Sequence, residues 1–309
     1  MVKYILKRCL QALPVLFGAT FLVYGLVFLQ PGDPIRALCG QHCPNEAGLD
    51  IIRARYNLDK PFILQYLLYM KNLLLGDFGT TFSGRSVSDI IATSMPNTIH
   101  LGLIAIAFEI ILGVGIGIIV GIRRGSFFDS SILVITLILI SIPTFVLGFV
   151  CQLVFGMNLG IVPPTVGSST DFEHMYMPAL ILATGSIASI CRLTRNSIQD
   201  NSYADHVRTS YAKGLPRYQV TLRHIFRNSM IPVVTYIGAD LGALMGGAVL
   251  TETIFNIQGI GNQLYAAIQR GEGTTVVSII TLFVIIFVVT NIVVDILYAV
   301  LDPRIRYGK

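Results

Sequence analysis

The sequence is poor in charged residues. Asp, Glu, Lys and Arg make up 13% of its 309 residues, whereas hydrophobic residues make up 53%. The charged fraction is about half that of soluble globular domains, which argues against a soluble fold. Long apolar runs take the place of charge, so we expect an all-α integral membrane protein. The net charge of +5 is then read by its distribution across the membrane and does not indicate a nucleic-acid partner.

Motifs for nucleotide binding and hydrolysis are also missing. The sequence has no GxxxxGK[ST] loop to cradle phosphates, no GxSxG nucleophile turn and no HExxH metal motif. It offers no combination of nucleophile, base and metal for an intramembrane enzyme. We therefore expect no catalytic residues, no metal site and no cofactor on this chain, and an energy source on another chain.

Cysteine is scarce, with five residues in the chain. Cys39 and Cys43 fall in a predicted outer loop, where an oxidising compartment would permit a disulfide. Free thiols are the alternative, and His42 between them leaves a weak C-x-x-H-C metal pattern open. The other three fall in or at the edges of apolar runs and are expected to be inert packing residues: Cys9, Cys151 and Cys191.

Six apolar runs are long enough to cross a membrane as helices. They are Cys9–Leu29, Thr98–Ile122, Ser130–Phe155, Met177–Leu193, Ile231–Leu250 and Val276–Tyr298. The first is longer than the apolar part of a usual signal peptide and no A-x-A-like site precedes Pro31, so we expect it to be retained. An even number of spans places both termini on the same side.

Lys and Arg predict which side that is. The segments that share a side with the N-terminus are rich in both, whereas the short loops 156–176 and 251–275 hold only Arg270. Cytoplasmic segments carry such an excess, so we expect the N- and C-termini in the cytoplasm. The chain then divides into the first helix (1–30), an extracytoplasmic insertion (31–97) and a five-helix membrane core (98–309).

A polar, basic stretch, residues 203–232, interrupts the apolar core. Within it, Gly214 suits the left-handed residue that ends a helix, and Pro216 suits the first turn of the next. We therefore expect two short helices, Tyr203–Lys213 and Leu215–Asn228, that meet at a tight cytoplasmic corner before Pro232 opens the next span. We call residues 203–229 the elbow. An amphipathic basic helix could instead lie on anionic membrane lipid.

Small residues and acids mark the predicted spans. Glycines recur every four residues in the second and fifth spans, a spacing that lets helices pack closely: Gly113, Gly117 and Gly121, then Gly238, Gly242 and Gly246. Glu109 and Asp240 fall inside these two spans, where an ionisable group tends to face a bundle interior or a watery pathway. Together with Met245 they are our candidates for the substrate pathway. Asp295 falls near the inner end of the last span, where we expect it to pair with an inner Arg.

An ordered series of short motifs carries a resemblance to a known family. The motifs are Pro31-Gly32-Asp33-Pro34, Leu58-Asp59-Lys60-Pro61, Gly76-Asp77-Phe78-Gly79, Arg192-Leu193-Thr194-Arg195, Asp205-His206-Val207-Arg208-Thr209, Arg223-His224, Ile231-Pro232, Leu250-Thr251-Glu252-Thr253-Ile254-Phe255 and Leu301-Asp302-Pro303-Arg304. Across essentially its whole length the chain resembles the permease subunit of a bacterial ABC importer. Within that superfamily it is most similar to the dipeptide, oligopeptide and nickel group, and to its B-type dipeptide permeases.

In that family the elbow is a pair of coupling helices that docks on an ATPase. Its Gly matches Gly214, its Glu-Ala-Ala triplet falls at Arg208-Thr209-Ser210, and the Pro of its pattern falls on Arg227. The last two positions depart from the pattern. The resemblance implies coupling roles for the exposed corner and its flanks, which we assign to Arg208, Thr209, Ala212, Lys213, Gly214, Leu215, Arg223 and His224.

The resemblance also implies a type I importer fold in the bacterial inner membrane and a set of partners. These are a homologous second permease, two cytoplasmic ATPases that hold ATP and Mg²⁺, and an extracytoplasmic binding protein that delivers short peptides. Relatives carry nickel chelates, haem or glutathione-like cargo as well, and the residues do not decide among them. A proton-coupled secondary transporter that uses Asp240 or Glu109 is the competing class.

Overall fold

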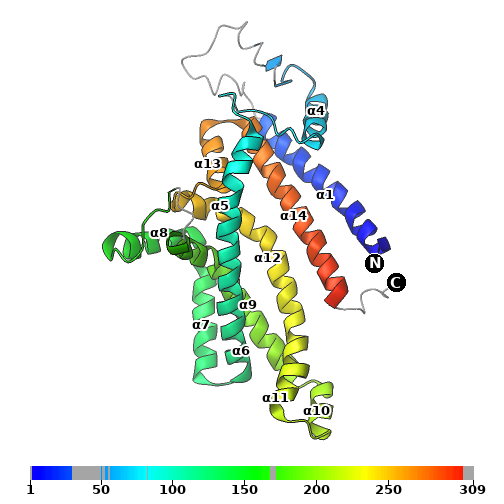
Figure 1. Cartoon of the computed structure of the whole chain (residues 1–309), viewed down its shortest axis with the longest axis vertical. Helices are drawn as coiled ribbons and strands as arrows, with labels where there is room; N and C mark the ends of the chain where they lie inside the picture. The colour runs from blue at the N-terminus through cyan, green and yellow to red at the C-terminus, as the bar shows by residue number, and fades with distance from the viewer. Residues whose placement is uncertain are drawn as a thin grey trace.

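In the computed structural model the chain is a bundle of long helices, and the structure describes residues 2–29, 50, 53–54, 56–81, 83–167 and 172–301 (Figure 1). Five helical stretches are long and apolar enough to cross a membrane, and a bent pair makes a sixth if it counts as one span. The helices are α1 (Val2–Phe28), α4 (Phe62–Leu74), α5 (Val87–Phe108), η2 (Glu109–Val114), α6 (Gly115–Ile122), α7 (Phe127–Ser141), α8 (Thr144–Cys151), η3 (Gln152–Asn158), α9 (Phe172–Ser202), α10 (Asp205–Ala212), α11 (Arg217–Val220), η4 (Thr221–Phe226), α12 (Arg227–Ile254), α13 (Ile260–Arg270) and α14 (Gly273–Leu301).

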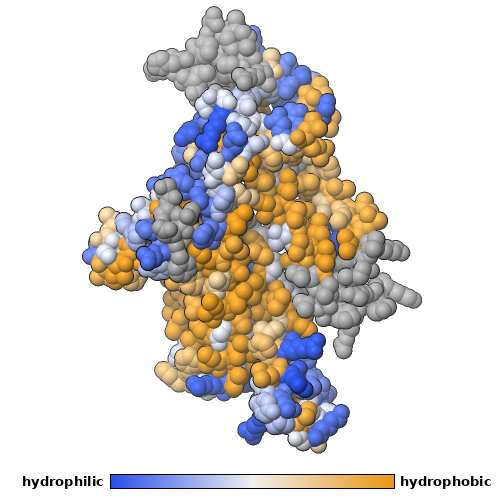
Figure 2. Space-filling model, viewed as in Figure 1, coloured by the Kyte–Doolittle hydropathy of each residue, from blue (hydrophilic) through white to orange (hydrophobic). Residues whose placement is uncertain are grey.

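The two ends of the molecule differ in content. The elbow, with α10 and α11, lies at one end of the long axis, whereas α4 and α13 lie at the other (Figure 1). We call these the elbow end and the α13 end. Between them Figure 2 shows a broad hydrophobic band, with hydrophilic residues gathered at both ends. This distribution is the one expected of a protein that crosses a bilayer.

The third predicted span is not straight. Helices α7 and α8–η3 meet at an angle of 96° where Ser130–Phe155 was predicted to run as one helix. Ile142 and Pro143 are both extended, with ψ of 122° and 134°. Proline pushes the residue before it out of the helical region and lacks the N–H that would continue the helix, so the break falls at Pro143.

Two other predicted helix boundaries are wrong, one for a local reason and one for a tertiary reason. The helix of the second span begins at Val87, before Thr98, because the Ser86 side chain caps it by accepting a bond from the Ser88 N–H at 3.2 Å. The predicted boundary at Pro232 does not exist, since α11, η4 and α12 form one continuous helix that contains this proline. Membrane helices tolerate proline where neighbouring helices support the chain.

Glycine stripes hold the bundle together as predicted. Gly113, Gly117 and Gly121 lie against α9 residues that are also four apart, namely Ile190, Thr194 and Ile198. Gly238 and Gly242 lie against α14, at Val294 and Phe287, whereas Gly246 faces open space. The packing interpretation of the first stripe is confirmed, and that of the second is confirmed for two of its three members.

The α13 end has its own small core. Helices α1, α4 and α14 pack through Tyr24, Tyr66, Met70 and Val277. The Tyr66 and Thr20 hydroxyls lie 2.9 Å apart, and Tyr69 donates to the Thr281 hydroxyl at 2.9 Å. The amphipathic helix predicted at Pro61–Leu75 is thus confirmed as α4, and its aromatic face fastens it to the membrane helices.

Candidate coupling elbow and translocation wall

The corner of the elbow is a helix-ending turn centred on Gly214. Gly214 has φ of +78°, the left-handed conformation in which residues with a Cβ are strained. Its N–H donates to the Tyr211 carbonyl at 2.9 Å, and the Leu215 N–H donates to the Ser210 carbonyl at 3.3 Å. This is the Schellman arrangement, in which glycine allows the last carbonyls of a helix to be satisfied. The predicted corner is confirmed.

A small apolar cluster fastens the elbow to the bundle. Val207 of α10, Val220 of α11 and Ile225 of η4 pack around Ile198 near the end of α9, and all four are buried. Reciprocal bonds lie one turn away from Ile225: the Ser197 and Ser229 hydroxyls each donate to the other's carbonyl at 3.0 Å. The elbow therefore has no hydrophobic core of its own. It is fixed to the bundle through α9 and the start of α12.

Most of the predicted coupling residues face outward. Six of them are exposed and two, Leu215 and His224, are partly buried; the exposed ones are Arg208, Thr209, Ala212, Lys213, Gly214 and Arg223. A Cβ on Gly214 would meet no atom within 4 Å in this chain. The elbow therefore presents a shaped, basic surface with space around its corner.

The two predicted pathway acids lie together. Glu109, the first residue of the wide turn η2, is fully buried between helices, and its carboxyl faces Asp240 of α12 and Ser186 of α9. Neither oxygen of Glu109 has a hydrogen-bond partner, nor does the Asp240 Oδ2 atom. Met245, the third candidate, packs elsewhere, over Gly102 of α5. The structure thus brings two of the three candidates into one place.

Two ion pairs brace the membrane helices. Arg8 of α1 lies 3.2 Å from Asp295 of α14, which confirms the pairing expected for this acid. Sequence reasoning missed the second pair, in which the Arg195 guanidinium binds both carboxylate oxygens of the buried Asp129, with Nη2 2.8 Å from Oδ2. The sequence shows Asp129 and Arg195 at the ends of apolar runs. They are far apart in the chain, so no local pattern indicates that they pair.

Glu252 is the residue that sequence reasoning most clearly undervalued. It is fully buried at the α13 end of α12, beyond the membrane-crossing part of that helix. The Thr98 hydroxyl of α5 donates to its Oε1 at 2.6 Å, and the Asn262 N–H of α13 donates to its Oε2 at 2.9 Å. The Thr98 oxygen in turn accepts from the Ile260 N–H at 2.8 Å. One carboxylate therefore joins three helices.

The environment of Glu252 also affects its protonation. Burial raises its pKa to about 7, against hydrogen bonds from Thr98 and from the Asn262 and Gly261 backbone, which lower it. Glycine makes room for the carboxyl group, since a Cβ on Gly259 or Gly261 would overlap it. The nearby Gly-Ile-Gly sequence was the one sequence feature that could have indicated this site. Its meaning is clear only when the structure shows that Glu252 points at it.

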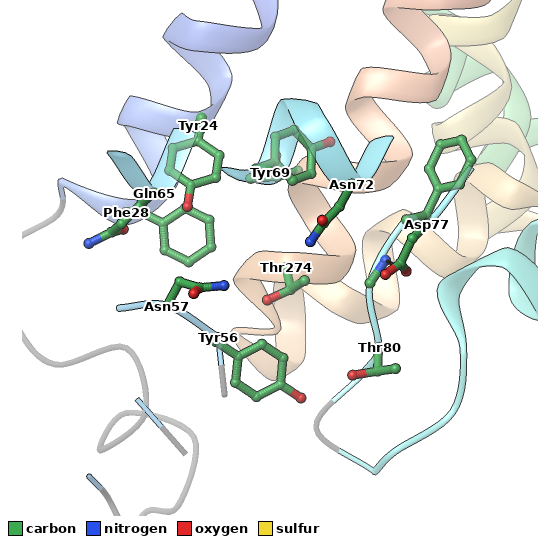
Figure 3. Close-up of a pocket in the computed structure, with 13 residues that line it drawn as sticks. Tyr24, Phe28, Tyr56, Asn57, Gln65, Tyr69, Asn72, Asp77, Thr80 and Thr274 are labelled. Atoms are coloured by element: carbon green, nitrogen blue, oxygen red, sulfur yellow. Dashed lines mark hydrogen bonds between the residues drawn. The ribbon is translucent and has the colours of Figure 1, made fainter. Parts of the chain in front are cut away.

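A polar pocket opens at the α13 end between α1, α4 and α14, with a volume of about 230 Å³. Figure 3 shows Asn57, Asn72 and Thr274 converging on the same space, with Tyr24 and Tyr69 on the helices behind them. Amides, hydroxyls and aromatic rings supply its lining, and Asp77 is its one acid. Such a surface suits polar contacts with a peptide or a protein loop.

Two further features concern the insertion and metal binding. The possible disulfide between Cys39 and Cys43 lies outside the described residues, and so does half of the helix predicted near Leu49–Tyr56. Within the described ranges, no group of three or more His, Cys, Asp or Glu side chains could hold a metal ion.

Comparisons with known proteins agree with this architecture. Residues 113–307 match the family described as the inner membrane component of binding-protein-dependent transport systems, and residues 1–102 match the N-terminal family of such membrane components. The chain is 36% identical over 308 residues to the glutathione transport system permease protein GsiC of Escherichia coli K12, covering 99% of this chain and 100% of that protein. It is 34% identical to the dipeptide transport system permease protein DppB of Alkalihalophilus pseudofirmus, with the same coverage.

A solved structure shows the same fold. The chain resembles one from the methionine ABC transporter MetNI in an inward-facing conformation, with a TM-score of 0.57 and 17% sequence identity. The similarity covers 69% of this chain and 96% of that one.

Proposed function

The chain belongs to the family of inner membrane components of binding-protein-dependent transport systems, and from this premise we propose that it imports short peptides by coupling to ATPases through the elbow. It is the permease subunit of an ABC importer of the type I fold, located in the inner membrane. The family is not enzymatic, and ATP hydrolysis belongs to partner subunits.

The observation that carries the coupling proposal is the open corner at Gly214. The corner projects from the bundle on two short helical arms, its glycine is exposed, and a Cβ added to it would meet no atom of the described residues within 4 Å. A cytoplasmic ATPase with a cleft for such a corner would touch the backbone of Gly214 and the exposed Arg208, Lys213 and Arg223. Closure of two ATPases on ATP and Mg²⁺ would then move the elbow of this chain and that of a second permease.

The translocation wall follows from the interior of the bundle. The Glu109–Asp240 pair lies where η2, α9 and α12 meet, and Met245 lies where α12 meets α5. In this proposal α12, which extends from the elbow, moves as the transporter changes state, and the polar groups of this region become exposed to the pathway in one of the two transport states.

Cargo is proposed as short peptides, a class that includes both dipeptides and glutathione. The two relatives with full-length similarity are named for these two substrates, at 34% and 36% identity. The polar pocket at the α13 end, together with the insertion 31–97, would meet the extracytoplasmic binding protein that delivers the peptide. Because the binding protein selects cargo first, this chain needs only a pathway that tolerates a small zwitterion.

Reconstitution tests the proposal. Purification of tagged chain from membranes should recover a second permease and an ATPase, and liposomes that hold the complex and its binding protein should accumulate a labelled dipeptide or glutathione only with ATP inside. Nickel chelate and haem serve as competing cargoes. Uptake of one of these in place of peptides would refute the cargo, and ATP-independent uptake would refute the coupling.

One observation favours a second candidate. The buried Glu109, whose carboxyl oxygens have no hydrogen-bond partner, and the half-buried Asp240, whose Oδ2 atom has none, are the kind of pair that proton-coupled transporters use. That candidate predicts uptake by the chain alone, driven by a pH gradient and abolished by Asp240→Asn. The same liposomes without ATPase decide between the two.

A further inference from the structure

One uninterrupted helix connects the elbow to Glu252. Arg217–Val220, Thr221–Phe226 and Arg227–Ile254 follow each other with right-handed helical backbone at the junction residues Thr221 and Arg227. The last of these stretches alone has 28 residues, so at about 1.5 Å each it is about 42 Å long. This length exceeds the roughly 30 Å of bilayer hydrocarbon, and the helix reaches both membrane surfaces. A continuous helix of this length gives movement at its elbow end a direct route to its α13 end.

At the α13 end the helix ends in the three-way joint made by Glu252. Its carboxylate binds Thr98 of α5 and the backbone at the start of α13, and Thr98 also holds the Ile260 N–H. Asn97, beside Thr98, adds a bond from its Nδ2 atom to the Gln258 carbonyl at 2.8 Å. Hydrogen bonds in a buried, water-excluded place are stronger than those exposed to water. The joint therefore resists separation of α12, α13 and α5.

Helix α13 turns one face inward and the other outward. Ile260, Leu264 and Ala267 are buried against α14, whereas Tyr265 and Ile268 are exposed at the surface of the α13 end. The inward face packs this helix against the bundle, and the outward face is available to a partner. Because Glu252 binds the N-terminal turn of α13, a shift of α12 changes where that outward face lies.

We propose that α12 and α13 move as one body joined at Glu252. Displacement of the elbow then repositions α13, and docking of the binding protein on α13 displaces the elbow. Glu252 and Thr98 are positioning residues in this proposal: they touch neither peptide nor nucleotide. The inference rests on the proposed function, and it gives that function a route for signals across the membrane.

Thr98→Val is the sharpest variant, because it keeps the shape of the side chain and removes the hydroxyl that bridges Glu252 and Ile260. The test uses the complete transporter in nanodiscs, with ATP hydrolysis measured with and without peptide-loaded binding protein. We expect basal hydrolysis to stay within about twofold of wild type and stimulation by the binding protein to fall at least about fivefold, the low end of allosteric couplings. Thr98→Ser should retain stimulation, and Thr93→Val, an exposed position on the same helix, is the matched control.

Two outcomes would overturn the inference. In one, Thr98→Val is stimulated as strongly as wild type. In the other, basal and stimulated hydrolysis fall by the same factor, which indicates a merely structural role. A wild-type complex without any ATP-dependent uptake is a different failure, because it removes the proposed function before the joint is tested.

A second measurement leaves the joint intact and so does not depend on a variant that folds. Spin labels at the exposed Tyr218 of α11 and Gln269 of α13 report the distance between the two ends of the proposed body. We expect this distance to be the same in nucleotide-free and ATP-bound complexes, while the distance from Gln269 to a label at Leu6 of α1 changes. A nucleotide-dependent change in the Tyr218–Gln269 distance would overturn the proposal.

Discussion

Gly214 and Glu252, at opposite ends of one helical connection, depend on opposite surroundings. Gly214 has a strained backbone in open space, and no contact within this chain explains why the corner must stay bare. Glu252 is enclosed on all sides, and its contacts within the chain account for it fully. The role that we propose for Gly214 therefore depends on a partner, whereas the role of Glu252 can be argued from this chain alone.

Replacing Gly214 by Arg should abolish transport while the chain still reaches the membrane in normal amounts. The reason is that an Arg side chain would occupy the space that we assign to the ATPase. Gly125→Arg is a matched control, because Gly125 has φ of +75°, lies in another exposed turn, and a Cβ added to it would also meet no atom within 4 Å. Both variants bear a left-handed strain of about 1 kcal/mol. Uptake and ATPase co-purification are measured, and normal uptake by Gly214→Arg would remove the elbow from the mechanism.

Thermal stability should depend on pH through Glu252. Its pKa is raised from the unfolded value of 4.5 to about 7, so the folded chain binds a proton in this window more tightly than the unfolded chain does. The stabilising contribution is therefore present at low pH and is lost as pH rises through 7. Between pH 8 and 5.5 this amounts to about 2 kcal/mol.

Melting temperatures of purified protein at these two pH values check the sign. The wild-type chain should gain stability on acidification relative to Glu252→Gln, which cannot titrate. An equal response of wild type and Glu252→Gln to pH would contradict the assignment.

At the scale of elements, close helix contacts determine which glycines matter. A Cβ at Gly117 would lie 2.6 Å from the Cβ of Thr194 and 2.8 Å from the Cys191 carbonyl oxygen, closer than real side chains approach. Gly115, two residues away, has nothing within 4 Å. Spacing by four identified the first of these as part of a seam and correctly left the second outside it.

Gly117→Val should therefore destabilise the α6–α9 contact, whereas Gly115→Val should not. Overpacking of a tight contact costs on the order of 1–3 kcal/mol, and the obstacle here includes backbone that cannot rotate away. Melting of the detergent-purified variants measures the difference. If both valines lower the melting temperature equally, α6 and α9 do not pack as described.

Prolines show where sequence reasoning about elements stops. Pro143 and Pro232 both fall inside apolar runs, yet the first breaks its helix by 96° and the second lies within a continuous one. The difference is tertiary: near Pro232 the Ser197–Ser229 bonds hold α12 to α9, and no local pattern announces them. Apolar length and glycine spacing are local properties and were predicted. The uninterrupted α12 and the Glu252 joint depend on partners far away in sequence.

At the scale of the whole molecule, charge separates the elbow end from the short loops of the other end; the insertion 31–97, which holds Lys60, Lys71 and Arg85, is too long for the charge rule to apply. Within the described residues the elbow end carries Arg123, Arg124 and the basic residues of the elbow, whereas the segment that holds α13 has Arg270 as its one basic residue. Membrane proteins retain Lys- and Arg-rich segments in the cytoplasm. ATP is also in the cytoplasm, so the charge pattern and the proposed coupling role both require the elbow on the cytoplasmic side.

Cysteines at Tyr218 and Gln269 test that orientation in a chain whose native cysteines are replaced. A membrane-impermeant maleimide should label Gln269→Cys but not Tyr218→Cys in intact spheroplasts, and the reverse in inverted vesicles. Both side chains are exposed, at opposite ends of the bundle, so accessibility reflects the side of the membrane and not burial. Labelling of Tyr218→Cys from outside would place the elbow away from every cytoplasmic ATPase. The basic corner, the long helix and the Glu252 joint would then have no nucleotide-driven movement to transmit.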